Sequence, residues 1–322
     1  LQVMSTPTKG KVAIVGSGLI GSSWAALFVS AGYSVTLFDV GDEQLARARD
    51  NVRKNLMQLE AEGLTRGSTS TTDAMSHLTA TTSLANALNG AIYVQESTVE
   101  SVEFKQKIFA EMDAVAGPDT ILGSSTSTIP ASTFTENLKN RARCLVVHPV
   151  NPPLYLTLTE LVPAPWTDPS AVDRAYEIMS DIKQAPIRLR KEVVGFGVNR
   201  LQFALIAEAW RLVKDDVLSP EDVDKVLSEG LGPRYAFYGP FGVTHLNAPQ
   251  GVRDYYQRYG PGIVRVLKDF GPDPTFTEPE VLDKLDATFE KIMPVAKMVE
   301  HTAGRAKCLS ELAQLKRKLK QD

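Results

Sequence analysis

The chain has 322 residues, which is too long for one ordinary hydrophobic core and suits two domains. Its 43% hydrophobic and 23% charged residues exclude a disordered chain, and its net charge of -3 offers no basic excess for nucleic acid. No apolar run approaches the ~20 residues that span a bilayer, and two scattered cysteines make neither a disulfide framework nor a metal cluster. We therefore expect a cytoplasmic protein without nucleic-acid, membrane or metal partners, with a loose leader over residues 1–9.

The first predicted elements are a strand, a glycine loop, a helix and a second strand in direct succession. Residues 11–15 form a short β-branched run typical of a buried strand, and Gly16 to Gly21 follow at once. Residues 22–31 carry apolar side chains at helical spacing, and residues 34–38 predict the next strand. This order, completed within about 30 residues, is that of one βαβ unit.

The same alternation continues toward residue 193. Further strands are predicted over residues 91–95, 120–124 and 144–147, and further helices over residues 42–62 and 102–115. Alternation of this kind predicts an α/β fold with a doubly wound, mostly parallel sheet of the Rossmann type.

Beyond residue 193 the pattern becomes helical. A long helical pattern opens at Gly195 and runs to Lys214, and Ser219 followed by Pro220 is a helix-start signal. The sequence therefore predicts an α/β domain over residues 1–193 and an all-helical domain over residues 194–322.

The glycine loop has the spacing of a dinucleotide-binding turn. Gly16 allows the tight turn, Gly18 lets a pyrophosphate approach the backbone, and Gly21 lets the helix pack on the strand. The start of the helix then offers free N–H groups and a partial positive charge to the phosphates. The intervening residues of the predicted cofactor loop are Ser17, Leu19 and Ile20.

Asp39 distinguishes between the two nicotinamide cofactors because it ends the second predicted strand. A carboxylate at this point accepts hydrogen bonds from ribose hydroxyls and repels a 2′-phosphate. No lysine or arginine follows directly, since the next residues are Val40, Gly41 and Asp42. The sequence therefore predicts that the cofactor is NAD and that Asp39 helps to bind it.

His148 and Glu160 form the candidate catalytic pair. His148 directly follows an apolar strand, and the carboxyl ends of parallel strands face the ligand crevice. Glu160 lies among apolar neighbours, where an unpaired charge would be costly. Pairing would satisfy the carboxylate and fix the imidazole tautomer for acid–base work. On spacing alone, a structural histidine is an equal alternative.

Four motifs resemble those of the 3-hydroxyacyl-CoA dehydrogenase family. They are the glycine loop, Ser124-Ser-Thr-Ser127, residues 148–153 with Glu160, and residues 195–200. The resemblance covers nearly the whole chain from Lys11 onward and implies an NAD-dependent dehydrogenase. Within the family, the sequence is most similar to the lambda-crystallin branch, and the segments that carry this similarity are residues 16–24, 208–211 and 228–237.

The resemblance also implies a role for individual residues. His148 would be the catalytic acid/base, and Glu160 would orient it. Ser127 would hold the substrate oxygen, and Asn199 would contact the substrate or His148 from the second domain. The residues that match family positions near the cofactor are Glu100, Lys105 and Asn151.

The resemblance leaves the substrate open. The leading candidate is L-gulonate, oxidised to 3-dehydro-L-gulonate, with 3-hydroxyacyl-CoA and carnitine-type substrates as alternatives. A structural lens protein, alone or in a dual role, is an alternative of another class. Arg234 favours a free carboxylic acid as substrate, because a guanidinium binds a carboxylate through two donors. The alternative interpretation of Arg234 is a surface arginine or an interface ion pair. A homodimer is also implied, and the apolar helix expected over residues 201–213 needs such a partner.

Overall fold

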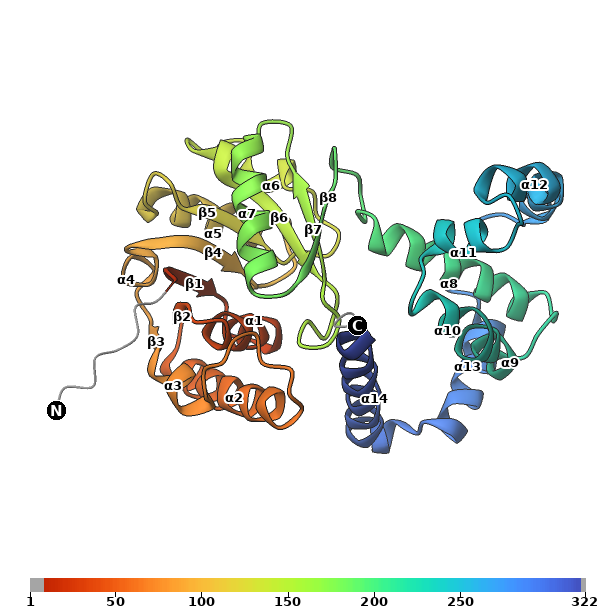
Figure 1. The fold of residues 1–322 in the computed structure, drawn as a ribbon, viewed down its shortest axis with the longest axis horizontal. Coiled ribbons are helices and arrows are strands. Elements are labelled where there is room, and N and C mark those ends of the chain that lie inside the picture. The colour runs from red at the N-terminus through yellow and green to blue at the C-terminus, as the bar shows by residue number, and fades with distance from the viewer. Residues whose placement is uncertain (1–8, 320–322) are drawn as a thin grey trace. The chain divides into compact units, whose positions relative to one another are not determined.

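The computed structural model describes residues 9–319, so the leader expected over residues 1–9 lies, apart from Lys9, outside the described residues (Figure 1). Two compact units divide the chain. The first extends to Arg200 and resumes at Ala306, and the second runs over Leu201–Arg305. The break thus falls after the expected boundary at residue 193. The physical reason is that the segment after residue 193 is held to the first unit by hydrogen bonds described below.

An eight-stranded sheet forms the centre of the first unit, in the order β3-β2-β1-β4-β5-β6-β7-β8. All neighbours pair in parallel except β6 and β7, which are antiparallel. The strands are β1 (Lys11–Val15), β2 (Ser34–Phe38), β3 (Leu78–Thr81), β4 (Ala91–Glu96), β5 (Ile121–Ser124), β6 (Cys144–Pro149), β7 (Leu158–Pro163) and β8 (Ala185–Arg188).

The strand order reverses between β1 and β4. The chain leaves β1 for β2 and β3 on one side, and it then returns to β4 on the other side of β1. In open α/β sheets, ligands bind in the crevice at the carboxyl ends of the strands that flank such a reversal. The cofactor crevice of this protein is therefore expected where β1 and β4 end, at Val15 and Glu96.

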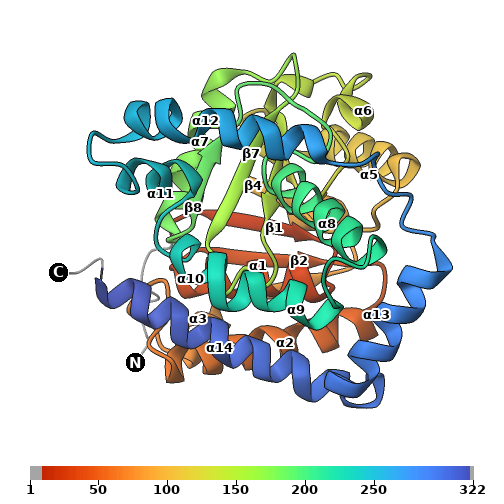
Figure 2. The same ribbon diagram turned by 90° about the vertical axis from the view of Figure 1, so that its right-hand side faces the viewer.

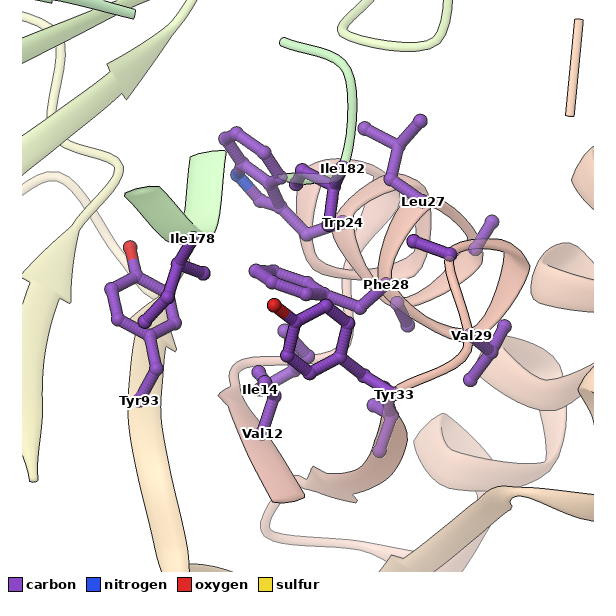
Figure 3. Close-up of a cluster of buried hydrophobic side chains, with 14 of the residues drawn as sticks. Val12, Ile14, Trp24, Leu27, Phe28, Val29, Tyr33, Tyr93, Ile178 and Ile182 are labelled. Atoms are coloured by element: carbon purple, nitrogen blue, oxygen red, sulfur yellow. The ribbon is translucent and has the colours of Figure 1, made fainter. Parts of the chain in front are cut away.

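Helices cover the sheet on both faces, as the alternating burial of β1 shows. Val12 and Ile14 join one hydrophobic cluster, whereas Ala13 and Val15 join another. Figure 3 shows the first cluster, where Trp24 and Phe28 of α1 pack with Tyr93 of β4. The helices of this unit are α1 (Leu19–Ser30), α2 (Asp42–Ala61), α3 (Thr71–Ser76), α4 (Leu84–Leu88), α5 (Val102–Val115), α6 (Ser132–Thr135), the 3-10 helix η1 (Arg141–Arg143) and α7 (Pro169–Asp181).

The predicted α/β fold is confirmed, and the strands expected from the sequence lie within a residue or two of their predicted bounds. Three strands were not predicted. β3 is short and half polar, β7 carries a glutamate among its apolar residues, and β8 is largely exposed. Each lacks the continuous apolar run that marks a buried parallel strand.

The second unit contains helices and, within its described residues, no strand (Figure 2). Ser219 caps α9 by accepting a hydrogen bond from Asp222, which confirms the helix start predicted there. The elements are α8 (Val198–Lys214), which begins in the first unit, α9 (Pro220–Lys225), the π-helical segment η2 (Val226–Leu231), α10 (Gly232–Tyr235), α11 (Pro240–Leu246), α12 (Val252–Asp269), α13 (Pro279–Ile292), the 3-10 helix η3 (Val295–Lys297) and α14 (Met298–Leu319).

The core of the second unit is small. Trp210, Val213, Val223 and Val281 form its buried cluster. Many large apolar side chains of α8 and α12 are exposed instead, among them Leu201, Phe203, Tyr259, Val264 and Leu267. Among residues 9–319, no helix combines the length and the apolar character needed to cross a membrane.

The last helix, α14, returns to the first unit. From Ala306 onward its residues belong to that unit, and Ala306, Leu309 and Ala313 pack against its larger core cluster. Arg317 donates a hydrogen bond to the carbonyl oxygen of Gly63 at 2.5 Å. Both ends of the described chain therefore contribute to the same α/β unit.

Candidate active site

The glycine loop has the shape that its spacing predicts. Gly16 has φ +92°, and a Cβ added to Gly21 would lie only 1.9 Å from the carbonyl oxygen of Gly16. A Cβ on Gly18 would meet nothing within 4 Å, so open space faces the backbone at this position. No side chain caps α1, which leaves the amide groups of its first turn available to an anion. Ser17 is buried, Ile20 is partly buried, and Leu19 is exposed.

Asp39 lies directly against this loop. One carboxylate oxygen accepts hydrogen bonds from the Ser17 amide at 2.9 Å and the Ser17 hydroxyl at 2.6 Å. The other accepts from the Val40 amide at 2.8 Å. The acid that ends β2 is thus held in a fixed orientation beside the loop that follows β1.

His148 and Glu160 come together because β6 and β7 are antiparallel. The two residues are directly opposite in the strand register, and His148 Nδ1 lies 2.8 Å from Glu160 Oε2. Both side chains are buried, with 7% of the histidine and none of the glutamate exposed. Since a carboxylate can only accept, Nδ1–H is the donor, and the second ring nitrogen is left as the base.

The second oxygen of Glu160 holds the start of α8. Oε1 accepts hydrogen bonds from the backbone amides of Gly197 at 2.8 Å and Val198 at 3.0 Å. A Cβ on Gly197 would lie 2.9 Å from this oxygen, so only glycine leaves room for the contact. These two amides were not predicted from the sequence as part of the site. The buried carboxylate was the available signal, because it needs more than one donor.

Ser127 and Asn199 also meet. The Asn199 side-chain amide donates to the Ser127 carbonyl oxygen at 2.7 Å. The Ser127 amide donates to Glu100 Oε1 at 2.9 Å, and the Ser127 hydroxyl does so at 3.2 Å. Thr126 Oγ1 donates to the same carboxylate oxygen at 2.6 Å. Glu100 therefore fixes the turn that presents Ser127.

The charge of Glu100 is stabilised by its neighbours. Partial burial would raise the pKa of Glu100, but the hydrogen bonds from Thr126 and Ser127 and the charge of Lys105 lower it overall. Lys105 Nζ lies 3.5 Å from Glu100 Oε2. The carboxylate accordingly stays ionised to a lower pH than that of an ordinary glutamate.

Lys105 is buried in an ion pair that the sequence did not predict. Its ammonium lies 3.1 Å from both oxygens of Glu96, and only 1% of its side chain is exposed. Glu96 also accepts hydrogen bonds from Ser124 Oγ and from Thr98. The sequence analysis gave Glu96 no role, although an acid directly after the strand predicted over residues 91–95 was a usable signal. Lys105 contacts Glu100, and Glu100 in turn binds Ser127.

Comparisons with protein-family models identify the family of this chain. The model of the 3-hydroxyacyl-CoA dehydrogenase NAD binding domain matches residues 11–193, and that of the 3-hydroxyacyl-CoA dehydrogenase C-terminal domain matches residues 195–288. The chain belongs to the 3-hydroxyacyl-CoA dehydrogenase family. As a member of this family, it is an NAD-dependent oxidoreductase.

Individual relatives of this dehydrogenase cover most of its length. Lambda-crystallin of Oryctolagus cuniculus is 44% identical over 98% of this chain and 99% of its own length. L-carnitine dehydrogenase of a Pseudomonas species is 34% identical over 87% of this chain and 86% of its own. A solved structure described as an NAD+ dependent dismutase, a dehydrogenase of a formyl-hydroxy-methylpyridine carboxylic acid, superposes with a TM-score of 0.81 at 26% identity over 96% of this chain and 98% of its own.

The glycine loop of this dehydrogenase fits NAD. Open space at Gly18, the uncapped start of α1 and the carboxylate of Asp39 supply the three features that bind a pyrophosphate and an unphosphorylated ribose. NAD would lie on this loop and supply the hydride acceptor.

The side chains of Asn151 and Arg234, two residues predicted for the site, have no hydrogen-bond or ion-pair partner among residues 9–319. Asn151 is exposed in the turn after β6. Arg234 belongs to α10 in the second unit, where it is exposed, and none of the carboxylates described between residues 9 and 319 forms an ion pair with it. The roles of these two residues and of the other site residues toward cofactor and substrate stay predictions.

Proposed function

We propose that this dehydrogenase oxidises a small 3-hydroxy acid to its 3-oxo acid, with L-gulonate as the leading substrate and 3-dehydro-L-gulonate as the product. The observation that carries the proposal is the buried pair of His148 and Glu160, with Nδ1 2.8 Å from the carboxylate. A histidine fixed in one tautomer at the carboxyl end of a strand has one free nitrogen for a substrate proton.

Each group at the site has one role in the proposed reaction. His148 Nε2 takes the proton of the substrate hydroxyl as the same carbon loses a hydride and its carbon–oxygen bond becomes a carbonyl. NAD held on the glycine loop would be the acceptor of that hydride. Glu160 stabilises the imidazolium that forms. Ser127 and Asn199 hold the substrate oxygen, as the family pattern implies. In the reverse direction, His148 returns the proton.

A polar acid is favoured over a coenzyme A thioester for two reasons. Arg234 offers an exposed guanidinium that could bind a free carboxylate through two donors. Relatives named for L-carnitine, which is itself a 3-hydroxy acid with a free carboxylate, are 34% identical. A 3-hydroxyacyl-CoA or carnitine-type substrate is the alternative, and a structural lens role could accompany catalysis.

We also propose that the protein is a cytoplasmic homodimer formed through its second unit. The exposed apolar side chains of α8 and α12 support a partner. A cavity of about 540 Å³ beside α8, lined by Phe203, Ile206 and Phe276, belongs to the same unit. Light scattering at micromolar concentration tests this proposal, and a monomer mass would contradict it.

The decisive experiment on function measures NADH formation with L-gulonate, L-3-hydroxybutyrate, L-carnitine and a 3-hydroxyacyl-CoA. We expect the highest kcat/KM with L-gulonate. His148→Gln should lower kcat by roughly two to four orders of magnitude, because a positioned acid/base contributes that much. NADH affinity should barely change. Full turnover by His148→Gln would remove this histidine from the mechanism.

A further inference from the structure

Successive residues of β4 point to opposite faces of the sheet, and its last two residues, Gln95 and Glu96, both contact the Ser124–Ser127 segment. Glu96 holds Ser124 on the side of Lys105, as described above. On the other side, Gln95 is fully buried next to Tyr93, and its side-chain amide donates to Ser125 Oγ at 2.6 Å. A buried amide among apolar residues is costly unless all its donors and acceptors are satisfied.

The amide of Gln95 is fully satisfied. Tyr93 OH donates to Gln95 Oε1. The two amide hydrogens go to Ser125 Oγ and to the Val147 carbonyl oxygen at 3.1 Å. The orientation of this side chain is therefore fixed, and its nitrogen always faces Ser125 as a donor.

A second fixed donor faces the same hydroxyl. Trp24 Nε1, on α1, donates to Ser125 Oγ at 3.2 Å. An indole N–H can only donate, and Trp24 is completely buried in the core. The two lone pairs of the Ser125 hydroxyl are thus both occupied, by Gln95 and by Trp24.

The hydrogen bond between Ser125 and Ser97 can then have only one donor. Ser125 Oγ lies 2.9 Å from Ser97 Oγ, and either hydroxyl could be the donor on distance alone. Because the lone pairs of Ser125 are occupied, its own hydrogen must point at Ser97. The hydrogen of the Ser97 hydroxyl is left without a partner among the described residues.

Ser97 stands where the strand order reverses. It follows β4 directly, and its amide donates to the Val15 carbonyl oxygen at the end of β1. A Cβ on Gly16 would lie 2.6 Å from the Ser97 carbonyl oxygen, so Ser97 borders the glycine loop. It is partly exposed. A cofactor bound across this crevice must pass Ser97.

We propose that Ser97 is a cofactor-binding residue whose hydroxyl donates a hydrogen bond to an acceptor oxygen of NAD, on its pyrophosphate or a ribose. Trp24 and Gln95 are positioning residues that keep this donor pointed outward by occupying Ser125. The inference requires only NAD binding, so it does not depend on which hydroxy acid is the substrate.

The test is a double-mutant cycle on NADH affinity, measured by calorimetric titration of the full chain. Ser97→Ala should weaken NADH binding about 3- to 10-fold, which is the usual net value of one hydrogen bond. Ser76→Ala is the matched control, because this serine lies on α3 and, among residues 9–319, its hydroxyl bonds only the Asp73 carbonyl oxygen. The control should leave NADH affinity unchanged, and both variants should keep the melting temperature.

The second arm of the cycle tests the direction of the hydrogen bonds. In Trp24→Phe, Ser125 regains a lone pair and can accept from Ser97, so adding Ser97→Ala should cost less than about 2-fold in affinity. If Trp24→Phe does not fold, the Tyr93→Phe/Gln95→Leu pair serves the same purpose, because it frees the other lone pair and leaves no unpaired tyrosine hydroxyl. A melting temperature alone would not separate these roles, whereas the affinity cycle does.

The acceptor is located by repeating the titrations with ADP and ADP-ribose. A loss with both ligands places it on the ADP part of the cofactor, that is, on the pyrophosphate or the adenosine ribose, and a loss with ADP-ribose alone places it on the terminal ribose. Unchanged affinity of Ser97→Ala for NADH would overturn the assignment of Ser97. Equal losses in the wild-type and Trp24→Phe backgrounds would overturn the positioning role of Trp24.

Discussion

At the scale of single residues, Glu160 joins two parts of the site through its two oxygens. One oxygen accepts from His148, and the other accepts from the amides that begin α8. The same carboxylate therefore sets the tautomer of the candidate base and the position of the segment that carries Asn199. A change at Glu160 should affect chemistry more than folding when the shape of the side chain is kept.

Glu160→Gln tests this separation. The glutamine oxygen can still accept from Gly197 and Val198, but its NH₂ group would face Nδ1 and favour the wrong imidazole tautomer. We expect kcat to fall by roughly two to four orders of magnitude. The melting temperature should fall less than in Glu160→Leu, which leaves two amides without an acceptor. Steady-state kinetics and thermal unfolding measure both effects, and wild-type turnover in Glu160→Gln would contradict the role.

Asp39 should decide the cofactor preference. Its carboxylate lies beside the glycine loop and would repel a 2′-phosphate, so wild type should strongly prefer NAD over NADP. Asp39→Ala should narrow the ratio of the two kcat/KM values by about 10-fold or more, the scale of a hydrogen bond to a charged group. Equal wild-type efficiencies with the two cofactors would reject this explanation.

The sequence analysis singled out residues with a direct chemical reason and gave no role to several residues that act through a neighbour. Asp39, His148 and Glu160 follow strands or sit oddly among apolar neighbours, and both signals are local. Gln95 was predicted only as the last residue of a strand over residues 91–95, and Glu96 was given no role. Their roles depend on which face of β4 meets Ser124 and Ser125, and that depends on strand order, which one sequence does not specify.

At the scale of elements, the turn after β5 depends on the end of β4. Pairing between β5 and β6 ends at Ser124 and Val146, and the chain then leaves the sheet to present Ser127. Beyond this point the Gln95 side-chain amide, in place of β5, donates a hydrogen bond to β6, at the carbonyl oxygen of Val147 one residue before His148. Sequence alternation could predict the parallel strands, but it could not predict that β7 runs antiparallel and so brings Glu160 opposite His148.

Acid should weaken this turn through Glu100. The folded pKa of Glu100 lies below its ordinary value of 4.5. Its contribution to stability is therefore complete above that pH and is lost as the pH falls through the lowered folded pKa. The difference in melting temperature between wild type and Glu100→Gln should be constant between about pH 5 and 8 and should shrink below it. A difference that does not vary between pH 7 and pH 3 would contradict this linkage.

At the scale of the whole molecule, the proposed substrate class rests on a residue outside the α/β unit. Arg234 was singled out from the sequence, and the structure shows it exposed on α10. The family relation supports the dehydrogenase fold for the full chain, whereas the acid proposed as substrate rests on the role proposed for this guanidinium. A substitution at Arg234 separates the two substrate classes.

Arg234→Ala should cost on the order of 2–4 kcal/mol in kcat/KM for L-gulonate, the scale of a lost contact to a desolvated charge. Arg234→Lys should recover only part of this loss, because an ammonium lacks the planar pair of donors. NADH affinity should be unaffected in both variants. An unchanged value for L-gulonate, or a larger loss with a 3-hydroxyacyl-CoA, would favour the thioester alternative.

The return of α14 makes the helical unit an insertion between two parts of the α/β unit. The chain crosses from one unit to the other near Arg200 and again near Arg305, so the units share two covalent connections. A single proteolytic nick near Arg200 would divide the chain into two fragments, and the packing of Ala306, Leu309 and Ala313 on the α/β unit would then hold them together without a covalent link. Loss of the chain after Arg305 would uncover the apolar patch that Ala306, Leu309 and Ala313 now cover, and the truncated protein should aggregate.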